Sequence, residues 1–416
     1  MPTKHRKFEK ILIIKDKNTM NRKTVIIALL ALIAMAGQAQ VKCHIEGELR
    51  DTTQGKTVII CPANVDIRVS DNYITAKADA RGHFSCDVET DRTELYEVFL
   101  HEQWEQGSWS NEKFLAENGA TVRFSFGDDK WKTVSGGPEQ TLKIKMDGEA
   151  ERLYLSKMDA IESKVKAELE PRIAELKAQG KNPEEDSLLM KRYQEFMTEY
   201  EKIFNEYRAW ELGYYAAHPM LYALYDIADQ MQYRSSRHDE QKTKLMALYH
   251  SAYENFHPEN PVHNTIRTQE AAWKLKPGQP YIDFEARTAD GKKVKVSSLY
   301  KGKVAVIDLW ASWCGPCRRH SRDLIPIYEK YKDKGFTVIG IAREDKVSDM
   351  TSAAKKDGYP WQSLIDLKDE LGVWQKNGLS FSGGGMYLVD RDGTILSTST
   401  EISKLEPLIR KALGED

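Results

Sequence analysis

Two cysteines, Cys314 and Cys317, are the residues of this chain whose chemistry and spacing are most informative. Gly315 and Pro316 separate them, so the motif reads C-x-x-C. Two thiols at this spacing can form and break a disulfide, and the thiolate is the nucleophile in that exchange. The motif therefore predicts dithiol-disulfide exchange, in which Cys314 attacks a substrate disulfide and Cys317 resolves the resulting mixed disulfide.

The sequence on either side of the motif predicts the elements that hold it. An apolar run at 304–307 indicates a short buried strand, and apolar residues three and four apart after the motif indicate a helix. A strand that leads straight into a helix places Cys314 at the helix N-terminus, where unpaired N–H groups and the macrodipole favour negative charge. Pro316 fits the first turn, because an N–H at that position has no intrahelical partner. We therefore expect Cys314 to be the attacking and more exposed thiol.

Residues 308–317 read D-L-W-A-S-W-C-G-P-C and resemble the active-site segment of thioredoxin. The C-terminal third resembles the TlpA/ResA branch of extracytoplasmic thioredoxin-like thiol-disulfide oxidoreductases. The segments that carry this resemblance are 278–284, 290–292, 299–303 and 387–393. The resemblance implies an α/β thioredoxin fold and a protein-disulfide reductase without a bound cofactor. It also implies protein thiols and disulfides as substrates, and a membrane protein as the electron donor.

The resemblance further implies roles for residues around the dithiol. Asp308 matches the buried aspartate of thioredoxin and would take the proton from Cys317, because burial raises the pKa of a carboxyl group. A purely structural buried acid is the alternative for this residue. Trp313, Gly315 and Pro316 would contact the substrate.

The segment that faces the cysteines departs from the family pattern. Thioredoxin-like proteins carry a cis-proline three residues before the strand that begins here at Tyr387, and Gly384 occupies that position. A cis peptide bond before a residue other than proline costs about 2.5–4 kcal/mol. We therefore expect a trans, more mobile or differently shaped segment, with Gly384 in contact with the substrate.

Other chemistries fit the sequence less well. It contains no second C-x-x-C and no H-x-x-x-H pair, so no metal site is predicted. Arg318 follows Cys317, which excludes the C-x-x-C-H haem attachment motif. The peroxiredoxin pattern P-x-x-x-[ST]-x-x-C is missing around Cys314. The 61 basic and 63 acidic residues give a net charge of −2, without the basic surplus of nucleic-acid-binding proteins.

The N-terminus predicts export from the cytoplasm. Residues 20–23 form a short basic region, residues 25–36 are apolar, and residues 37–39 read as a small-x-small cleavage site. We therefore predict a signal peptide over residues 1–39, with an extended n-region and cleavage after Ala39. The apolar run is too short for a good membrane span, and an uncleaved anchor is the alternative. The mature protein is expected to be periplasmic and not membrane-spanning.

The rest of the chain divides into three regions. Residues 40–146 contain short strands separated by turn signals, which predict an antiparallel β-sandwich. This region also loosely resembles a domain of unknown function that precedes thioredoxin-like modules. Residues 147–274 predict an α-helical region, because apolar side chains recur four and three apart between Leu189 and Trp210. Residues 275–416 predict the thioredoxin-like catalytic domain.

Three further cysteines, Cys43, Cys61 and Cys86, lie in the β-rich region. Scattered cysteines are commonly free and buried, and a Cys61–Cys86 disulfide is the alternative. For the whole chain, the alternative to an enzyme is a cell-envelope binding or assembly module with a vestigial or regulatory thioredoxin domain. The intact W-C-G-P-C sequence favours the enzyme.

Overall fold

A computed structural model describes residues 41–415, except 51–55, 64, 108–109, 129, 233–238 and 380–382. The predicted signal peptide, with its cleavage site after Ala39, lies outside the described residues. Within the described part of the chain, no helix combines the length and the apolar character needed to cross a membrane.

Two four-stranded sheets at the N-terminal end contribute side chains to one hydrophobic core. Their strand orders are β4-β1-β7-β8 and β3-β2-β5-β6. The prediction of an antiparallel arrangement is wrong for one pair, because β1 and β7 run parallel. Between β1 and β7 the chain also forms the strands of the other sheet, so these two neighbouring strands are distant in sequence. The strands are β1 (Val41–Leu49), β2 (Thr57–Pro62), β3 (Ile74–Lys77), β4 (His83–Thr90), β5 (Glu94–Leu100), β6 (Asn111–Ala116), β7 (Thr121–Gly127) and β8 (Lys130–Ser135).

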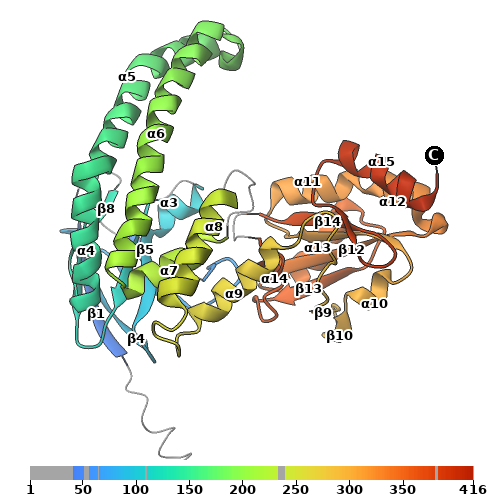
Figure 1. Cartoon of the computed structure of the whole chain (residues 1–416), viewed down its shortest axis with the longest axis horizontal. Coiled ribbons are helices and arrows are strands. Elements are labelled where there is room, and N and C mark those ends of the chain that lie inside the picture. The colour runs from blue at the N-terminus through green and yellow to red at the C-terminus, as the bar shows by residue number, and fades with distance from the viewer. Residues whose placement is uncertain are drawn as a thin grey trace, which may run out of the picture.

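Helices follow the sheets, after a short first helix between β5 and β6. Figure 1 shows that α5 and α6 form a long antiparallel hairpin that projects from the body of the molecule. The remaining helices of this region, α7 to α9, lie between the hairpin and the C-terminal sheet (Figure 1). The helices are α3 (His101–Glu105), α4 (Pro138–Ala150), α5 (Ser156–Ala178), α6 (Ser187–Ala217), α7 (Leu221–Gln230), α8 (Asp239–Leu248) and α9 (Val262–Trp273).

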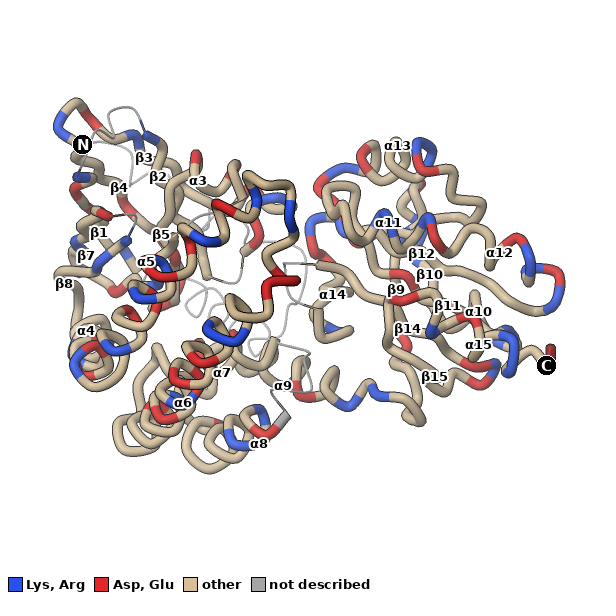
Figure 2. Tube along the Cα trace, turned by 90° about the horizontal axis from the view of Figure 1, so that it is seen from above, with Lys and Arg blue, Asp and Glu red and all other residues tan. Residues whose placement is uncertain are grey.

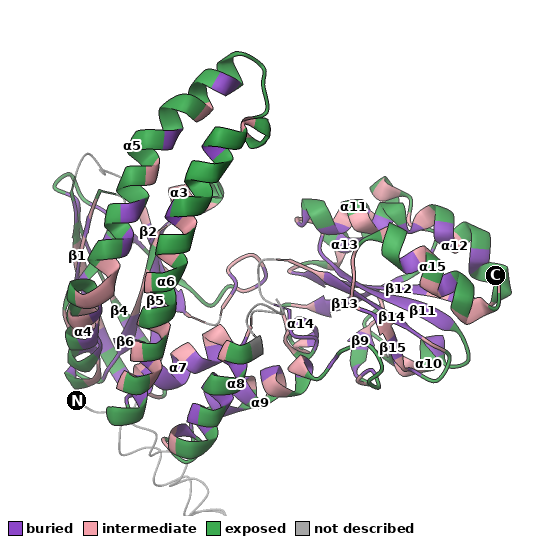
Figure 3. Cartoon of the chain, turned by 45° about the horizontal axis from the view of Figure 1, so that its top comes forward, coloured by how far each residue is buried: buried purple, intermediate pink, exposed green. Residues whose placement is uncertain are grey.

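The α5–α6 hairpin buries only a narrow apolar stripe. Leu189 and Phe196 of the predicted stripe pack against α5 residues such as Ile161, while Tyr193 is exposed. Pro171 lies inside α5, which runs on without division. Most of the outer surface of the hairpin is exposed (Figure 3). Two helices that meet along one stripe have little further apolar surface to bury, which explains their largely polar sequence.

The C-terminal region is one seven-stranded sheet, in the order β10-β9-β13-β12-β11-β14-β15. β11, β12 and β13 pair in parallel in the middle of the sheet. The pairings outside them, β14 with β11, β15 with β14, β9 with β13 and β10 with β9, are antiparallel, so the sheet is mixed. The strands are β9 (Glu285–Arg287), β10 (Lys293–Lys295), β11 (Val304–Trp310), β12 (Phe336–Glu344), β13 (Ser363–Leu367), β14 (Gly385–Val389) and β15 (Ile395–Ser397). The helices are α10 (Ser297–Tyr300), α11 (Gly315–Asp323), α12 (Ile325–Tyr331), α13 (Val347–Asp357), α14 (Val373–Lys376) and α15 (Ile402–Leu413).

Every residue of β11 is buried, because helices cover both faces of this sheet. Val304 and Val306 point to a core shared with α12 and α15, and Ala305 and Ile307 point to a core shared with α13 and α14. Side chains of a strand alternate between the two faces, so a strand covered on both sides reads as a continuous apolar run. This packing fixes β11, and the dithiol loop that follows it, at the centre of the sheet.

The three regions are packed against each other. Leu95 and Leu115 of the second sheet share a core with α7 and α9. Ala272, at the end of α9, and Leu275 belong to the core of the C-terminal sheet. Basic and acidic residues are interspersed along the described part of the chain (Figure 2), which agrees with the nearly neutral net charge.

Candidate active site

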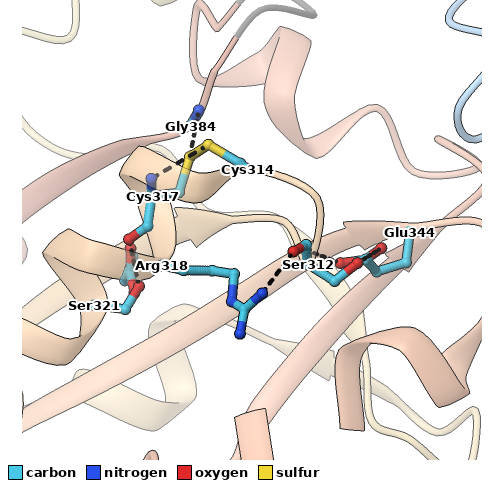
Figure 4. Close-up of a disulfide and its surroundings, with 8 residues drawn as sticks. Ser312, Cys314, Cys317, Arg318, Ser321, Glu344 and Gly384 are labelled. Atoms are coloured by element: carbon cyan, nitrogen blue, oxygen red, sulfur yellow. Dashed lines mark hydrogen bonds between the residues drawn. A yellow bond between two sulfur atoms is a disulfide. The ribbon is translucent and has the colours of Figure 1, made fainter. Parts of the chain in front are cut away.

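Cys314 and Cys317 form a disulfide at the start of α11, with their Cα atoms 5.3 Å apart (Figure 4). Cys314 is the N-cap residue of the helix, and its Sγ accepts a hydrogen bond of 3.3 Å from the Cys317 backbone N–H. Pro316 lies in the first helical turn. The strand-to-helix context predicted from the sequence is therefore confirmed.

The second element at the disulfide is the segment that enters β14. The Gly384 backbone N–H donates a hydrogen bond of 3.2 Å to Cys317 Sγ (Figure 4). A Cβ atom on Gly384 would lie 1.9 Å from the Leu309 carbonyl oxygen and 3.0 Å from Cys317 Sγ. Among the described residues there is no cis peptide bond. The position expected for a cis-proline thus holds a trans glycine, whose missing side chain lets the backbone approach the disulfide.

Asp308 lies in β11, six residues before Cys314, and is almost completely buried. Its Oδ2 accepts a hydrogen bond of 2.6 Å from the Ser321 hydroxyl of α11. Burial raises the pKa of Asp308 to about 7, and the hydrogen bond from Ser321 opposes part of that rise. A carboxyl group in this range can accept and return a proton near neutral pH.

A second buried carboxyl group, Glu344, holds the loop that carries the cysteines. It accepts hydrogen bonds from the Ser312 backbone N–H and, at 2.8 Å, from the Ser312 hydroxyl (Figure 4). Burial raises the pKa of Glu344 to about 7, despite these hydrogen bonds. The sequence predictions did not include Glu344. Its position at the end of a predictable strand, β12, could have identified it, because binding sites lie at the carboxyl ends of parallel strands.

A pocket of about 320 Å³ lies over the disulfide. It brings together all the site residues predicted from the sequence, which are Asp308, Trp313, Cys314, Gly315, Pro316, Cys317 and Gly384. Arg68, from the N-terminal β region, also lines the pocket and was not predicted. No local pattern marks this arginine, because only the packing of distant regions places it here.

Both cysteines of the pocket are buried. Cys314 is 6% exposed and Cys317 is 7% exposed, so the expectation that Cys314 is the more exposed thiol is wrong. The physical reason is the wall of the pocket, which includes Trp313 and Arg68 in addition to the segment at Gly384.

The cysteines of the β-rich region are free, so the alternative of a Cys61–Cys86 disulfide is wrong. Burial raises the pKa of the Cys43, Cys61 and Cys86 thiols, that of Cys86 to about 11. They are therefore thiols rather than thiolates at neutral pH and unreactive. The residues that the structure describes include no group of three or more His, Cys, Asp or Glu side chains able to hold a metal ion.

The C-terminal region is similar in sequence to proteins of known families. Residues 277–398 match the model of the AhpC/TSA family. The chain is 26% identical over 124 residues to the thiol-disulfide oxidoreductase ResA of Bacillus thuringiensis strain Al Hakam, covering 30% of this chain and 69% of that protein. It is 29% identical over 168 residues to the "Probable phospholipid hydroperoxide glutathione peroxidase" of Nicotiana sylvestris, covering 35% of this chain and 98% of the relative.

Two solved structures align with about a third of the chain. One is the thioredoxin domain of a thiol-disulfide oxidoreductase from Bacteroides vulgatus, with 24% identity and a TM-score of 0.31, covering 34% of this chain and 99% of that one. The other is a thiol:disulfide interchange protein from a Bacteroides species, with 25% identity and a TM-score of 0.31, covering 34% and 91%. By its sequence match, the C-terminal region of this chain is a thioredoxin-like domain of the AhpC/TSA family, similar to thiol-disulfide oxidoreductases and preceded by a separate N-terminal region.

Proposed function

We propose that this chain is a periplasmic thiol-disulfide oxidoreductase that reduces protein disulfides through Cys314 and Cys317. The observation that supports the proposal most strongly is the disulfide at the N-terminus of α11, with a backbone N–H at each sulfur. The similarity to ResA, which is named a thiol-disulfide oxidoreductase, agrees with this activity. Periplasmic location rests on the signal-peptide pattern of residues 1–39.

The proposed reaction begins with the reduced enzyme. The Cys314 thiolate attacks one sulfur of a substrate disulfide, so a bond forms between Cys314 and that sulfur while the substrate S–S bond breaks. The other substrate sulfur leaves as a thiolate and takes a proton from water. Cys317 then loses its proton to Asp308 and attacks Cys314 Sγ, which breaks the bond to the substrate. The second substrate sulfur leaves as a thiolate and takes a proton from water. The substrate gains two electrons, and the enzyme loses two as its disulfide forms.

The neighbouring groups fit the charges that develop in this sequence. The N–H groups of Cys317 and Gly384 point at the two sulfurs and would stabilise negative charge on them. Asp308, with its pKa raised to about 7, can take the Cys317 proton and later give it up. A membrane dithiol protein is the proposed source of the two electrons that restore the reduced enzyme.

Insulin-disulfide reduction with dithiothreitol as electron donor tests this function. The wild-type chain should accelerate the reaction, and Cys314→Ser should reduce the rate to that of dithiothreitol alone. Cys317→Ser should accumulate a covalent adduct with the substrate, detectable by non-reducing electrophoresis, because the resolving thiol is missing. Equal rates for the wild type and Cys314→Ser would contradict the proposal and favour a binding or assembly module.

Reduction of peroxides is the second candidate, because a relative that covers the domain is named a glutathione peroxidase. The sequence lacks the P-x-x-x-[ST]-x-x-C pattern of peroxiredoxins at Cys314, which is why disulfide exchange is preferred. Consumption of hydrogen peroxide by the reduced chain, measured beside the insulin assay, distinguishes the two. A peroxide rate above the insulin rate would reverse this order.

A further inference from the structure

The loop between β2 and β3 in the N-terminal region reaches the dithiol pocket of the C-terminal domain. We call residues 65–73 the docking loop. Its Asp66 accepts a hydrogen bond of 2.6 Å from Nη1 of Arg343, a fully buried residue of β12. The two residues are 277 positions apart in the chain. Burial acts to raise the pKa of Asp66, but hydrogen bonds from Arg68 and the charge of Arg343 outweigh it and hold the pKa below its usual value. Asp66 is therefore ionised, and the buried pair joins the two regions.

Arg68 of the docking loop is placed against the active-site segment. Its guanidinium carbon lies 3.8 Å from the centre of the Trp313 ring, the residue next to Cys314. Asp66 holds the guanidinium in this position, through bonds of 2.8 Å to Nε and 2.7 Å to Nη2. A stacked and doubly hydrogen-bonded guanidinium has little freedom to move. Arg68 is therefore a fixed wall of the pocket over the disulfide.

Apolar residues that alternate with Asp66 and Arg68 anchor the docking loop in its own region. Ile67 packs against Ile59, Cys61 and Phe99 of the second sheet, and Val69 is buried. A loop with apolar anchors on one side and a buried ion pair on the other behaves as part of both regions.

The size of the pocket then limits what can reach the sulfurs. A cavity of about 320 Å³ is at the small end of the range that accepts small molecules, and both cysteines are more than nine-tenths buried. Such a cavity admits a disulfide on an extended segment or on a small molecule. The flat face of a folded protein would meet Arg68 and Trp313 before its sulfur reached Cys314.

We propose that the docking loop selects the substrate class of the dithiol, which is disulfides in extended or unfolded polypeptide segments, and that Arg68 is the residue that excludes disulfides on folded surfaces. This inference rests on the proposed disulfide exchange, because it assigns a substrate class to the same site. Arg68 is a specificity-determining residue with no part in the bond-breaking steps.

Single-turnover kinetics with chromogenic mixed disulfides tests the inference. One probe is an unstructured peptide whose cysteine carries thionitrobenzoate, and the other is the same adduct on a surface cysteine of a folded carrier protein. Attack by Cys314 breaks the S–S bond and releases coloured thionitrobenzoate. Hydroxyethyl disulfide serves as a small reference substrate for every variant. The wild type should prefer the peptide over the carrier by about tenfold or more.

Arg68→Ala should bring this preference close to one by raising the carrier rate, and Arg68→Lys should keep part of it, because lysine restores most of the bulk. Asp66→Asn should act in the same direction by loosening the loop. Arg81→Ala, an exposed arginine in a turn of the same region, is the matched control and should retain the wild-type preference.

The results distinguish substrate selection by the docking loop from disulfide exchange at the two cysteines. A wild-type preference near one, or the same preference in wild type and Arg68→Ala, would overturn the role of the docking loop while leaving disulfide exchange in place. If the wild type reacts with none of the three probes, the proposed function itself is overturned.

Discussion

At the scale of single residues, the site is defined by two carboxyl groups that burial holds near neutrality. Asp308 lies six residues before Cys314, and Glu344 holds the loop before the cysteines, each with its pKa raised to about 7. Asp308 was predicted because its distance from the C-x-x-C motif matches a known segment. Glu344 was not, because its burial and its bonds to Ser312 depend on how β12 packs beside β11.

The raised pKa of Asp308 predicts a stability that depends on pH. The folded protein holds this proton more tightly than the unfolded chain, whose value is near the ordinary 3.8. The stability that this group contributes is therefore fully present below pH 3.8 and is lost as the pH rises through about 7. At about 1.4 kcal/mol per pKa unit, the loss amounts to roughly 4 kcal/mol at most.

Asp308→Asn should remove this loss. The free energy of unfolding of the oxidised variant should therefore rise relative to that of the wild type as pH increases from about 4 to 8. Turnover of the variant at neutral pH should fall, because the proton acceptor is missing. Denaturant unfolding across that pH range measures the gain. Ser321→Ala is the control: it removes a bond that lowers the pKa of Asp308, so the midpoint should move to higher pH. A wild-type stability that does not change across this range would contradict the titration.

Among the secondary-structure elements, the site lies where the N-terminus of α11 meets the segment that leads into β14. β11, β12 and β14 could be predicted from the sequence because they are apolar runs between turn signals. The apolar spacing after the motif predicted one helix, where the structure has two, α11 and α12. The parallel pairing of β1 with β7 could not be, because it depends on contacts between strands that are far apart in the chain. The close approach of Gly384 to Cys317 is likewise tertiary, although the position itself was predicted.

Gly384→Ala tests that close approach. The added Cβ would press on the Leu309 carbonyl oxygen and on Cys317 Sγ, so β14 must shift away from β11. We expect a loss of about 1–3 kcal/mol in the free energy of unfolding, typical of overpacking, together with a slower insulin reduction. Gly383→Ala is the matched control, because a Cβ there meets no atom within 4 Å. Wild-type stability and rate in Gly384→Ala would show that the segment can move away from Leu309 and Cys317 without cost.

In the whole molecule, the N-terminal region forms part of the pocket over the disulfide, through Arg68. Its fold class was indicated by strand and turn signals, but its contribution to the site was not. Neither Asp66 nor Arg68 belongs to a recognisable motif, and their roles arise from a contact with Arg343 across most of the chain.

Arg343→Met tests the connection between the regions. The variant removes the buried hydrogen bonds to Asp66 and Asp369, and bonds to charged groups contribute about 1.5–3 kcal/mol each. We expect faster amide hydrogen exchange in the docking loop, with little change in β11. Lys368→Met, which removes an exposed pair with Asp71, is the control and should leave the exchange of the loop unchanged. Unchanged exchange in Arg343→Met would mean that the buried pair does not hold the loop.

We expect Cys314 and Cys317 to cycle between a disulfide and two thiols within the folded protein. A redox titration in glutathione or dithiothreitol buffers measures this cycle, with the state of each cysteine read by alkylation and mass spectrometry. We predict one reversible two-electron transition, with slope of about 30 mV per tenfold change in the equilibrium constant, that is absent in Cys314→Ser and in Cys317→Ser. A pair that stays oxidised in every buffer until the protein unfolds would contradict it.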